Sequence, residues 1–123
     1  MRVIIESPYS ASLYSVEKHI FYSRRCLLDS LNRQESPVAF HLLYTQVLND
    51  KIELQRKKAM ELALRWYDAA NLCAVYTDLG ISAGMLTGMD YAKKINLKIE
   101  HRSLKNDNSN CEGLTESPGF SKR

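Results

Sequence analysis

Three short polar segments hold the side chains that could do chemistry, and each follows or ends an apolar run. Their candidate residues are Glu6, Ser7, Tyr9 and Ser10 in the first, His41 to Gln46 in the second, and Asp78, Ser82, Gly84 and Met85 in the third. Carboxylates serve enzymes as general acids, general bases and nucleophiles. The two carboxylates in these segments are therefore the predicted catalytic residues.

Each of the two carboxylates has a catalytic and a structural interpretation. Glu6 follows a buried strand, so desolvation would raise its pKa, although it could instead accept hydrogen bonds from backbone amides of the next turn. Asp78 could hold a hydroxyl group of a ligand or form an Asx-turn with Gly80. Both alternatives stay open for both residues.

The remaining candidates are predicted to bind a ligand. Tyr9 offers a flat face and a hydroxyl to a ligand, with Ser7 and Ser10 beside it. Ser82 precedes a predicted helix, whose free amides and positive dipole end attract anions, and Gly84 permits close approach. A plain Ser82 cap explains the same pattern, and Met85 is typical of a helix core.

The second segment offers an imidazole and an amide. His41 titrates near neutral pH and could be an acid, a base, a ligand contact or a structural residue. Residues 44–46, including Gln46, offer hydroxyl and amide groups for a ligand or a protein contact. No second histidine has metal-ligand spacing, so neither a metal nor a cofactor is expected.

Alternating hydrophobic patterns predict the elements that position these segments. Strands are predicted at residues 2–6, 37–41, 71–77 and 96–100. A first helix is predicted at residues 13–31, capped by Ser12. A second is predicted at about 50–70, where Asp50 begins a capping box and Trp66 lies on the core side. A third is predicted from Ser82 onward. Residues 42–46 fit a helical turn or a loop. This order predicts a small flavodoxin-like α/β domain: a parallel sheet with helices on both faces and a ligand at the strands' carboxyl ends.

Composition narrows the class of protein. The 123 residues carry a net charge of +3, without the basic stripe of a nucleic-acid groove. No apolar run approaches a membrane span, and no secretory leader is evident. Three cysteines, with Cys26 and Cys73 in apolar segments, favour a reducing compartment, so a cytoplasmic protein is expected. Residues 1–104 are predicted to form one domain, and 105–123, poor in apolar residues, a disordered tail.

The same three segments resemble an uncharacterised family of bacteria and phages that is similar to the nucleoside 2-deoxyribosyltransferases. The matching stretches are Val3-Ile4-Ile5-Glu6-Ser7-Pro8-Tyr9, Ala39-Phe40-His41-Leu42-Leu43-Tyr44-Thr45-Gln46, and Val75 to Met85 continued by Gly88, Met89 and Ala92. The resemblance covers residues 1 to about 104. It implies the same α/β fold, a nucleoside or nucleotide ligand and a homo-oligomer. Glu6 or Asp78 would then supply the carboxylate that glycosidic-bond cleavage requires, since that reaction passes through an oxocarbenium-like state. Asp78 could hold a sugar hydroxyl, Tyr9 the base, and residues 44–46 a base edge or a second subunit.

One departure from the transferases bears on function. They usually carry a nucleophilic Glu a few residues into the third helix, where this chain has Gly88. Asp90 would face roughly the opposite side of that helix. The resemblance therefore implies two alternatives: an enzyme that cleaves or transfers at an N-glycosidic bond, or a non-catalytic module, such as a phage accessory protein, that sequesters a nucleotide or ADP-ribose-type signal. A structural protein with a vestigial pocket is a third.

Overall fold

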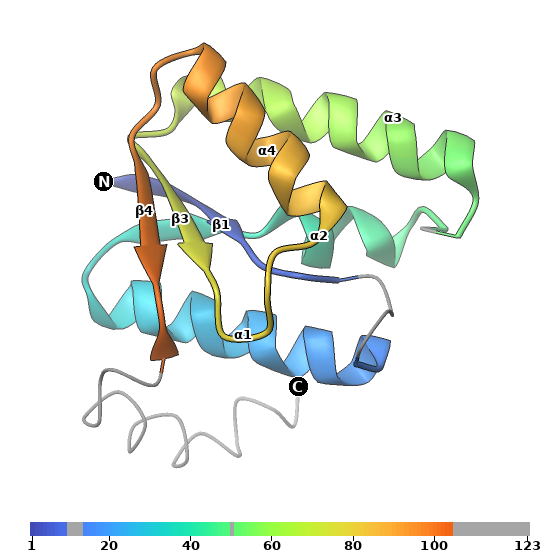
Figure 1. Cartoon of the computed structure of the whole chain (residues 1–123), viewed down its shortest axis with the longest axis horizontal. Helices are drawn as coiled ribbons and strands as arrows, with labels where there is room; N and C mark the ends of the chain where they lie inside the picture. The colour runs from blue at the N-terminus through green and yellow to red at the C-terminus, as the bar shows by residue number, and fades with distance from the viewer. Residues whose placement is uncertain (10–13, 50, 105–123) are drawn as a thin grey trace.

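The computed structural model describes residues 1–9, 14–49 and 51–104. Four parallel strands form one sheet in the order β2-β1-β3-β4 (Figure 1). Their bounds are β1 Arg2–Glu6, β2 Ser36–Val38, β3 Leu72–Tyr76 and β4 Ile99–Arg102. A flavodoxin-like sheet begins with the same strand order. The predicted flavodoxin-like α/β fold is confirmed.

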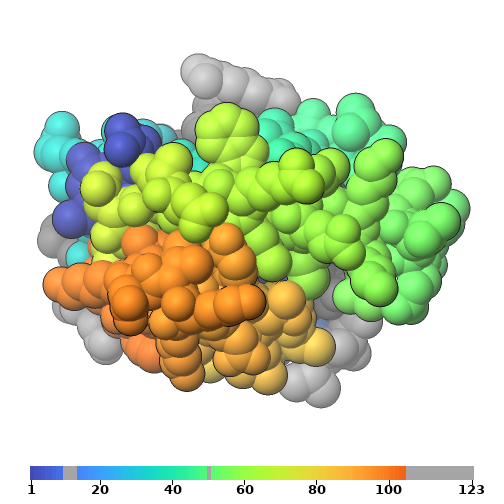
Figure 2. Space-filling model, turned by 90° about the horizontal axis from the view of Figure 1, so that it is seen from above, coloured from blue at the N-terminus to red at the C-terminus, as the bar shows by residue number. Residues whose placement is uncertain are grey.

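Helices cover both faces of the sheet, as predicted. Helix α1 (Val16–Asn32) lies on one face, while α3 (Glu53–Leu64) and α4 (Ala83–Lys94) lie on the other (Figure 1). Seen from above, α3 and α4 run side by side over the second face (Figure 2). Three short helical segments, α2 (Phe40–Leu43), η1 (Tyr44–Gln46) and η2 (Arg65–Ala69), complete the crossover from β2 to β3.

Side-chain alternation along the strands divides the core into two layers. Val3 and Ile5 of β1 pack with Tyr22 and Cys26 of α1. The intervening Ile4 packs with residues of α4 and η2 on the opposite face. The strands therefore read as nearly continuous apolar runs, as expected for a parallel sheet covered on both faces.

The order of the strands reverses at β1, from which the chain extends toward both edges of the sheet. The connection from β1 through α1 leads to β2 at one edge, whereas later strands extend from β1 toward β4 at the other edge. The crevice at the carboxyl ends of strands around such a reversal is the usual ligand position in open α/β sheets. Glu6, the last residue of β1, lies at this point.

Four local predictions about the elements were wrong. The second strand ends at Val38 rather than at residue 41, because residues 40–46 continue as α2 and η1. Helix α1 begins after Ser15, whose side chain accepts a hydrogen bond from Lys18 N, and α3 begins after Ile52 without a side-chain cap. The last strand starts at Ile99, three residues later than predicted. Predicted caps Ser12 and Asp50 and the predicted tail, 105–123, lie outside the described residues.

Trp66 also differs from its predicted core position. Its side chain is 56% exposed in η2, beyond the end of α3, and stacks against Phe40 at a centroid distance of 6.1 Å. The helical stripe that included it ends with α3 at Leu64. Cys26 and Cys73 are buried free thiols, as predicted.

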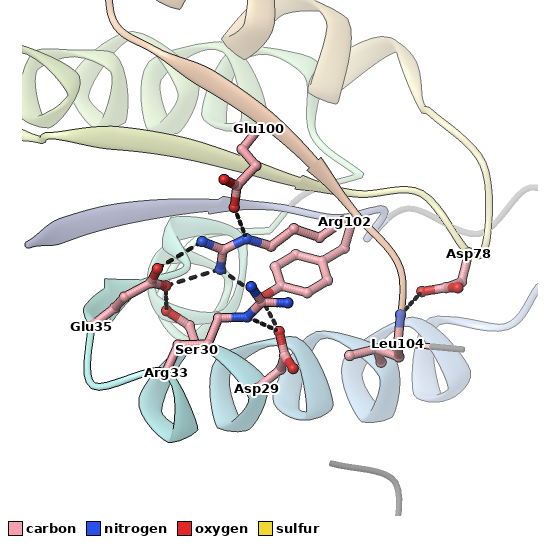
Figure 3. A network of polar contacts seen from close by, with 9 residues as sticks. Asp29, Ser30, Arg33, Glu35, Asp78, Glu100, Arg102 and Leu104 are labelled. Carbon is pink, nitrogen blue, oxygen red and sulfur yellow. Dashed lines mark hydrogen bonds and ion pairs between the residues drawn. The ribbon is translucent and has the colours of Figure 1, made fainter. Parts of the chain in front are cut away.

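A buried ionic network holds β4 to α1 and to the turn before β2 (Figure 3). Arg102 donates from Nη2 to Glu35 at 2.7 Å and from Nη1 to the Tyr76 hydroxyl at 3.1 Å. Tyr76 donates in turn to Asp29 at 2.7 Å. The Arg102 side chain is only 3% exposed, so these contacts replace the water it loses on folding.

Within the described part of the chain, no helix is long and apolar enough to span a membrane.

Candidate functional site: the Glu6 cavity

A cavity of about 180 Å³ opens at the carboxyl end of β1, beneath α3 and α4. We call it the Glu6 cavity. Its polar lining consists of Glu6, Ser7, Tyr9, His41, Tyr44, Thr45, Arg56, Tyr67 and Ser82. Its apolar lining includes Ile4, Phe40, Met60, Leu64 and Met85. An apolar enclosure with a few convergent polar groups is the usual form of a small-molecule site.

Glu6 reaches the cavity because of its place in the strand alternation. It follows Ile4 by two residues, so its side chain points to the face covered by α3 and α4. The residue is 7% exposed, and its Oε2 accepts a hydrogen bond from the Tyr67 hydroxyl of η2. This bond satisfies one carboxylate oxygen in a place that water reaches poorly.

Burial changes the acidity of this pair. Desolvation raises the pKa of Glu6 from its ordinary value of 4.5 to about 7, and the hydrogen bond from Tyr67 opposes part of that shift. Desolvation and the nearby Glu6 carboxyl group both raise the pKa of Tyr67. Near neutral pH, Glu6 is therefore present in both protonated and ionised forms, as a general acid or base requires.

Gly88 on α4 leaves the space that the Glu6–Tyr67 pair occupies. A Cβ atom at this position would lie 2.7 Å from the Tyr67 hydroxyl oxygen and would overlap the Glu6 carboxyl group. Any side chain at position 88 would thus displace the pair. The carboxyl group in this part of the cavity comes from β1, and the helix supplies room for it.

A second polar cluster lies where β1, α1 and α2 meet. Ser7 Oγ is 2.7 Å from His41 Nε2, Ser23 Oγ is 3.0 Å from the same nitrogen, and the two hydroxyls are 2.6 Å apart. Ser7 is 4% exposed and Ser23 is fully buried. We call this group the Ser7–His41 cluster.

His41 is neutral at physiological pH. Burial lowers its pKa to about 4, and His19 contributes further in the same direction. The His19 ring is itself fixed by a hydrogen bond between Nδ1 and the Tyr9 carbonyl oxygen, 2.9 Å apart. A neutral imidazole carries one proton, so one of its nitrogens is free to accept a hydrogen bond.

The mouth of the cavity carries one cation among its described lining residues. Arg56 of α3 is 3.6 Å from Glu53, a largely exposed partner that holds it weakly. The first turn of α4 lies in the same lining, with Ala83 and Gly84 after the Ser82 N-cap. Ser82 Oγ accepts from Met85 N at 3.2 Å, which confirms the predicted Ser82 cap.

The cavity collects most of the residues predicted as a site. Those that line it are Glu6, Ser7, Tyr9, His41, Ser82, Gly84 and Met85. Gln46 does not line it: its side chain is exposed and donates to the Leu42 carbonyl oxygen. Ser10 lies outside the described residues.

Asp78 lies on the other face of the sheet from Glu6. Its carboxylate accepts hydrogen bonds from the Tyr22 hydroxyl at 2.8 Å, from Leu104 N at 2.9 Å and from Ser103. Desolvation and the contact with Asp78 both raise the pKa of Tyr22. These contacts join α1 to the segment after β4. Figure 3 shows the bond from Leu104 N to Asp78. Asp78 has a visible structural function, and it does not line the Glu6 cavity.

Two important residues were missed by the sequence analysis. Tyr67 lies in an irregular helical segment, and Ser23 interrupts the apolar stripe of α1 as a polar gap. The gap at Ser23 was a usable signal, because a buried serine on an apolar face needs a polar partner. No comparable signal identified Tyr67. Among the described residues, no three His, Cys, Asp or Glu side chains are placed to share a metal ion.

Comparison with protein families finds one family model that matches most of the chain. Residues 1–102 match the model of a family described as Domain of unknown function (DUF7768). The chain therefore belongs to this family, and the match covers all four strands of the sheet. No curated protein matches the chain in sequence.

Proposed function

We propose that the chain binds a nucleoside or nucleotide in the Glu6 cavity and that Glu6 acts on its N-glycosidic bond. The observation that carries the proposal is the Glu6–Tyr67 pair, a buried carboxyl group whose pKa is raised to about 7 beside an open cavity. Protonation of a leaving base by such a group assists formation of the oxocarbenium-like state. The resemblance to the nucleoside 2-deoxyribosyltransferases supports the choice of ligand.

The size of the cavity supports a particular placement of the ligand. Its volume of about 180 Å³ is below the ~300–1,000 Å³ of sites that enclose drug-sized molecules. The cavity therefore encloses one ring, which we assign to the sugar beside Glu6. The base would extend to the aromatic side chains of Tyr9 and Phe40, and a phosphate would extend toward Arg56.

A second function, ligand binding without turnover, is favoured by one observation. Glu6 is the only carboxylate among the described lining residues, because Asp78 lies on the opposite face. Glycosidases usually use two carboxylates. A module with one carboxylate would capture a nucleotide or ADP-ribose-type signal.

The homo-oligomer implied by the resemblance stays a prediction, which light scattering after size exclusion tests.

One experiment separates these functions. The purified chain is mixed with a panel of deoxynucleosides, deoxynucleotides and ADP-ribose, and free base is measured by chromatography while stability is measured by thermal melting. Saturation at 100 times the dissociation constant adds roughly 2.7 kcal/mol of stability. Glu6→Gln should abolish base release, whereas Glu61→Gln, an exposed glutamate on α3, should not. Stabilisation without base release supports the binding module. If no ligand stabilises the chain and none releases its base, both functions are contradicted.

A further inference from the structure

The Ser7–His41 cluster is not used by the function proposed above, although it faces the same cavity. A hydroxyl within hydrogen-bond distance of an imidazole nitrogen is the arrangement that activates a serine nucleophile. The 2.7 Å separation of Ser7 Oγ and His41 Nε2 meets that requirement. Both residues line the cavity, so a small ligand that enters it can reach them.

We propose that Ser7 and His41 form a nucleophile–base pair that cleaves carboxylic esters of small acyl groups, with Ser7 Oγ as the attacking atom. The inference rests on these contacts and is independent of the nucleoside ligand. The cavity of about 180 Å³ limits the acyl group to a few carbons, and its apolar wall at Ile4 and Phe40 suits a hydrocarbon chain.

The reaction balances without any added reagent except water. Ser7 Oγ attacks the carbonyl carbon of the ester, and its proton passes to His41 Nε2. The bond between that carbon and the alkoxy oxygen breaks, and the alcohol leaves with the proton from His41. Water then attacks the acyl-Ser7 ester and gives a proton to His41, which returns it to Ser7 Oγ as the acid leaves.

The groups around Ser7 and His41 bear on their roles as nucleophile and base. Ser23 Oγ, 2.6 Å from Ser7 Oγ and 3.0 Å from His41 Nε2, holds both groups in place from α1. Because burial lowers the pKa of His41 to about 4, the imidazole is unprotonated at neutral pH and has a nitrogen lone pair for the serine proton, although it is a weaker base than an ordinary histidine. Ala83 and Gly84 of the first turn of α4 also line the cavity, and their amides, which have no intrahelical acceptor, could serve a developing oxyanion.

A covalent probe tests the pair directly. The full chain is incubated with a small alkyl fluorophosphonate, whose phosphorus Ser7 Oγ attacks with loss of fluoride, and the adduct is located by intact mass and peptide mapping. One label at Ser7 is expected, together with hydrolysis of p-nitrophenyl acetate. Ser7→Ala should abolish both signals. His41→Gln should slow labelling by roughly 10²-fold, the lower end of the usual contribution of a general base.

The controls keep this result separate from the nucleoside experiment. Ser30→Ala removes another buried serine of α1, the helix that carries Ser23. Ser30 donates to Glu35 instead of contacting an imidazole, so this change should leave labelling unchanged. Label on another residue, or labelling of Ser7→Ala at the rate of the original chain, overturns the proposal. An unlabelled Ser7 in a folded chain also overturns it. Neither assay contains a nucleoside, so such a failure leaves the function of Glu6 unaffected.

Discussion

The Tyr67 hydroxyl donates a hydrogen bond to Oε2 of Glu6 in the volume that a side chain on Gly88 would occupy. Three elements thus share one polar contact: β1 provides the acid, η2 the donor, and α4 the space. This arrangement makes the acidity of Glu6 depend on the packing of α4 over the sheet. Changes at any of the three positions should therefore be coupled.

The raised pKa of Glu6 predicts how stability depends on pH. Because its folded-state pKa of about 7 exceeds the ordinary value of 4.5, its favourable contribution is complete below about pH 4.5 and is lost as pH rises through about 7. Between these two pH limits, the contribution of Glu6 to the free energy of unfolding changes by about 3 kcal/mol at most. Glu6→Gln should remove this dependence, so it should gain stability relative to the original chain between pH 4.5 and 8 in urea titrations. The opposite contribution of His41 is present in both proteins and cancels. If the free energies of unfolding of the two proteins changed with pH in parallel, the raised pKa of Glu6 would be contradicted.

Gly88→Ala should destabilise the protein and perturb the site. The added methyl group overlaps Glu6 and Tyr67, and overpacking of a filled interior typically costs about 1–3 kcal/mol. Gly84→Ala is the matched control, because its Cβ would lie 3.5 Å from Met60 Cε, an ordinary contact. The control should be neutral or up to about 1 kcal/mol more stable, since alanine favours helices. In a Glu6→Ala background, the penalty of Gly88→Ala should shrink. An unchanged penalty there would show that the overlap is with other atoms.

Asp78→Ala tests the separation of the two faces. Removing the acceptor shared by Tyr22, Ser103 and Leu104 should lower the free energy of unfolding by about 1–3 kcal/mol. Labelling of Ser7 and ligand affinity, measured well below the melting temperature, should remain unchanged. Loss of affinity in a folded Asp78→Ala protein would restore this residue to the site.

Arg102→Gln should be more damaging than its position near a strand end suggests. It leaves the Glu35 carboxylate, 12% exposed, without its cation, and removal of one partner of a buried pair typically costs about 3–5 kcal/mol. The double variant Arg102→Met/Glu35→Met should recover much of that loss, because neither charge then remains buried. Thermal and urea unfolding of the two proteins measure the difference. Equal instability would indicate that packing, rather than charge, dominates.

The fold could be predicted from the sequence because its signals are local and repeated. The apolar runs before Glu6 and before Thr77 identify two central strands, and the Ser82 cap identifies the start of α4. Short edge elements were less predictable. Val38 ends β2 and Phe40 begins α2 within three residues, too few to show either period.

The site could be predicted in part, because the carboxyl ends of parallel strands meet at one edge. That rule brought Glu6, Tyr9 and His41 together. It failed for Asp78, although the alternation of β3 contained the answer: Leu72, Ala74 and Tyr76 all face α1, and Asp78 continues that series. Tyr67 could not be found in this way, because its contact with Glu6 joins residues 61 positions apart through a crossover.

The position of Arg102 in the chain has a consequence for biosynthesis. Glu35, its ion-pair partner, precedes it by 67 residues, and Tyr76 also precedes it. A nascent chain that has not yet exposed β4 from the ribosome thus contains Glu35 without the guanidinium group that neutralises it. The ion pair between Arg102 and Glu35 forms only when β4 has joined the sheet. Prematurely terminated chains, which lack β4, should therefore be cleaved by proteases faster than completed chains.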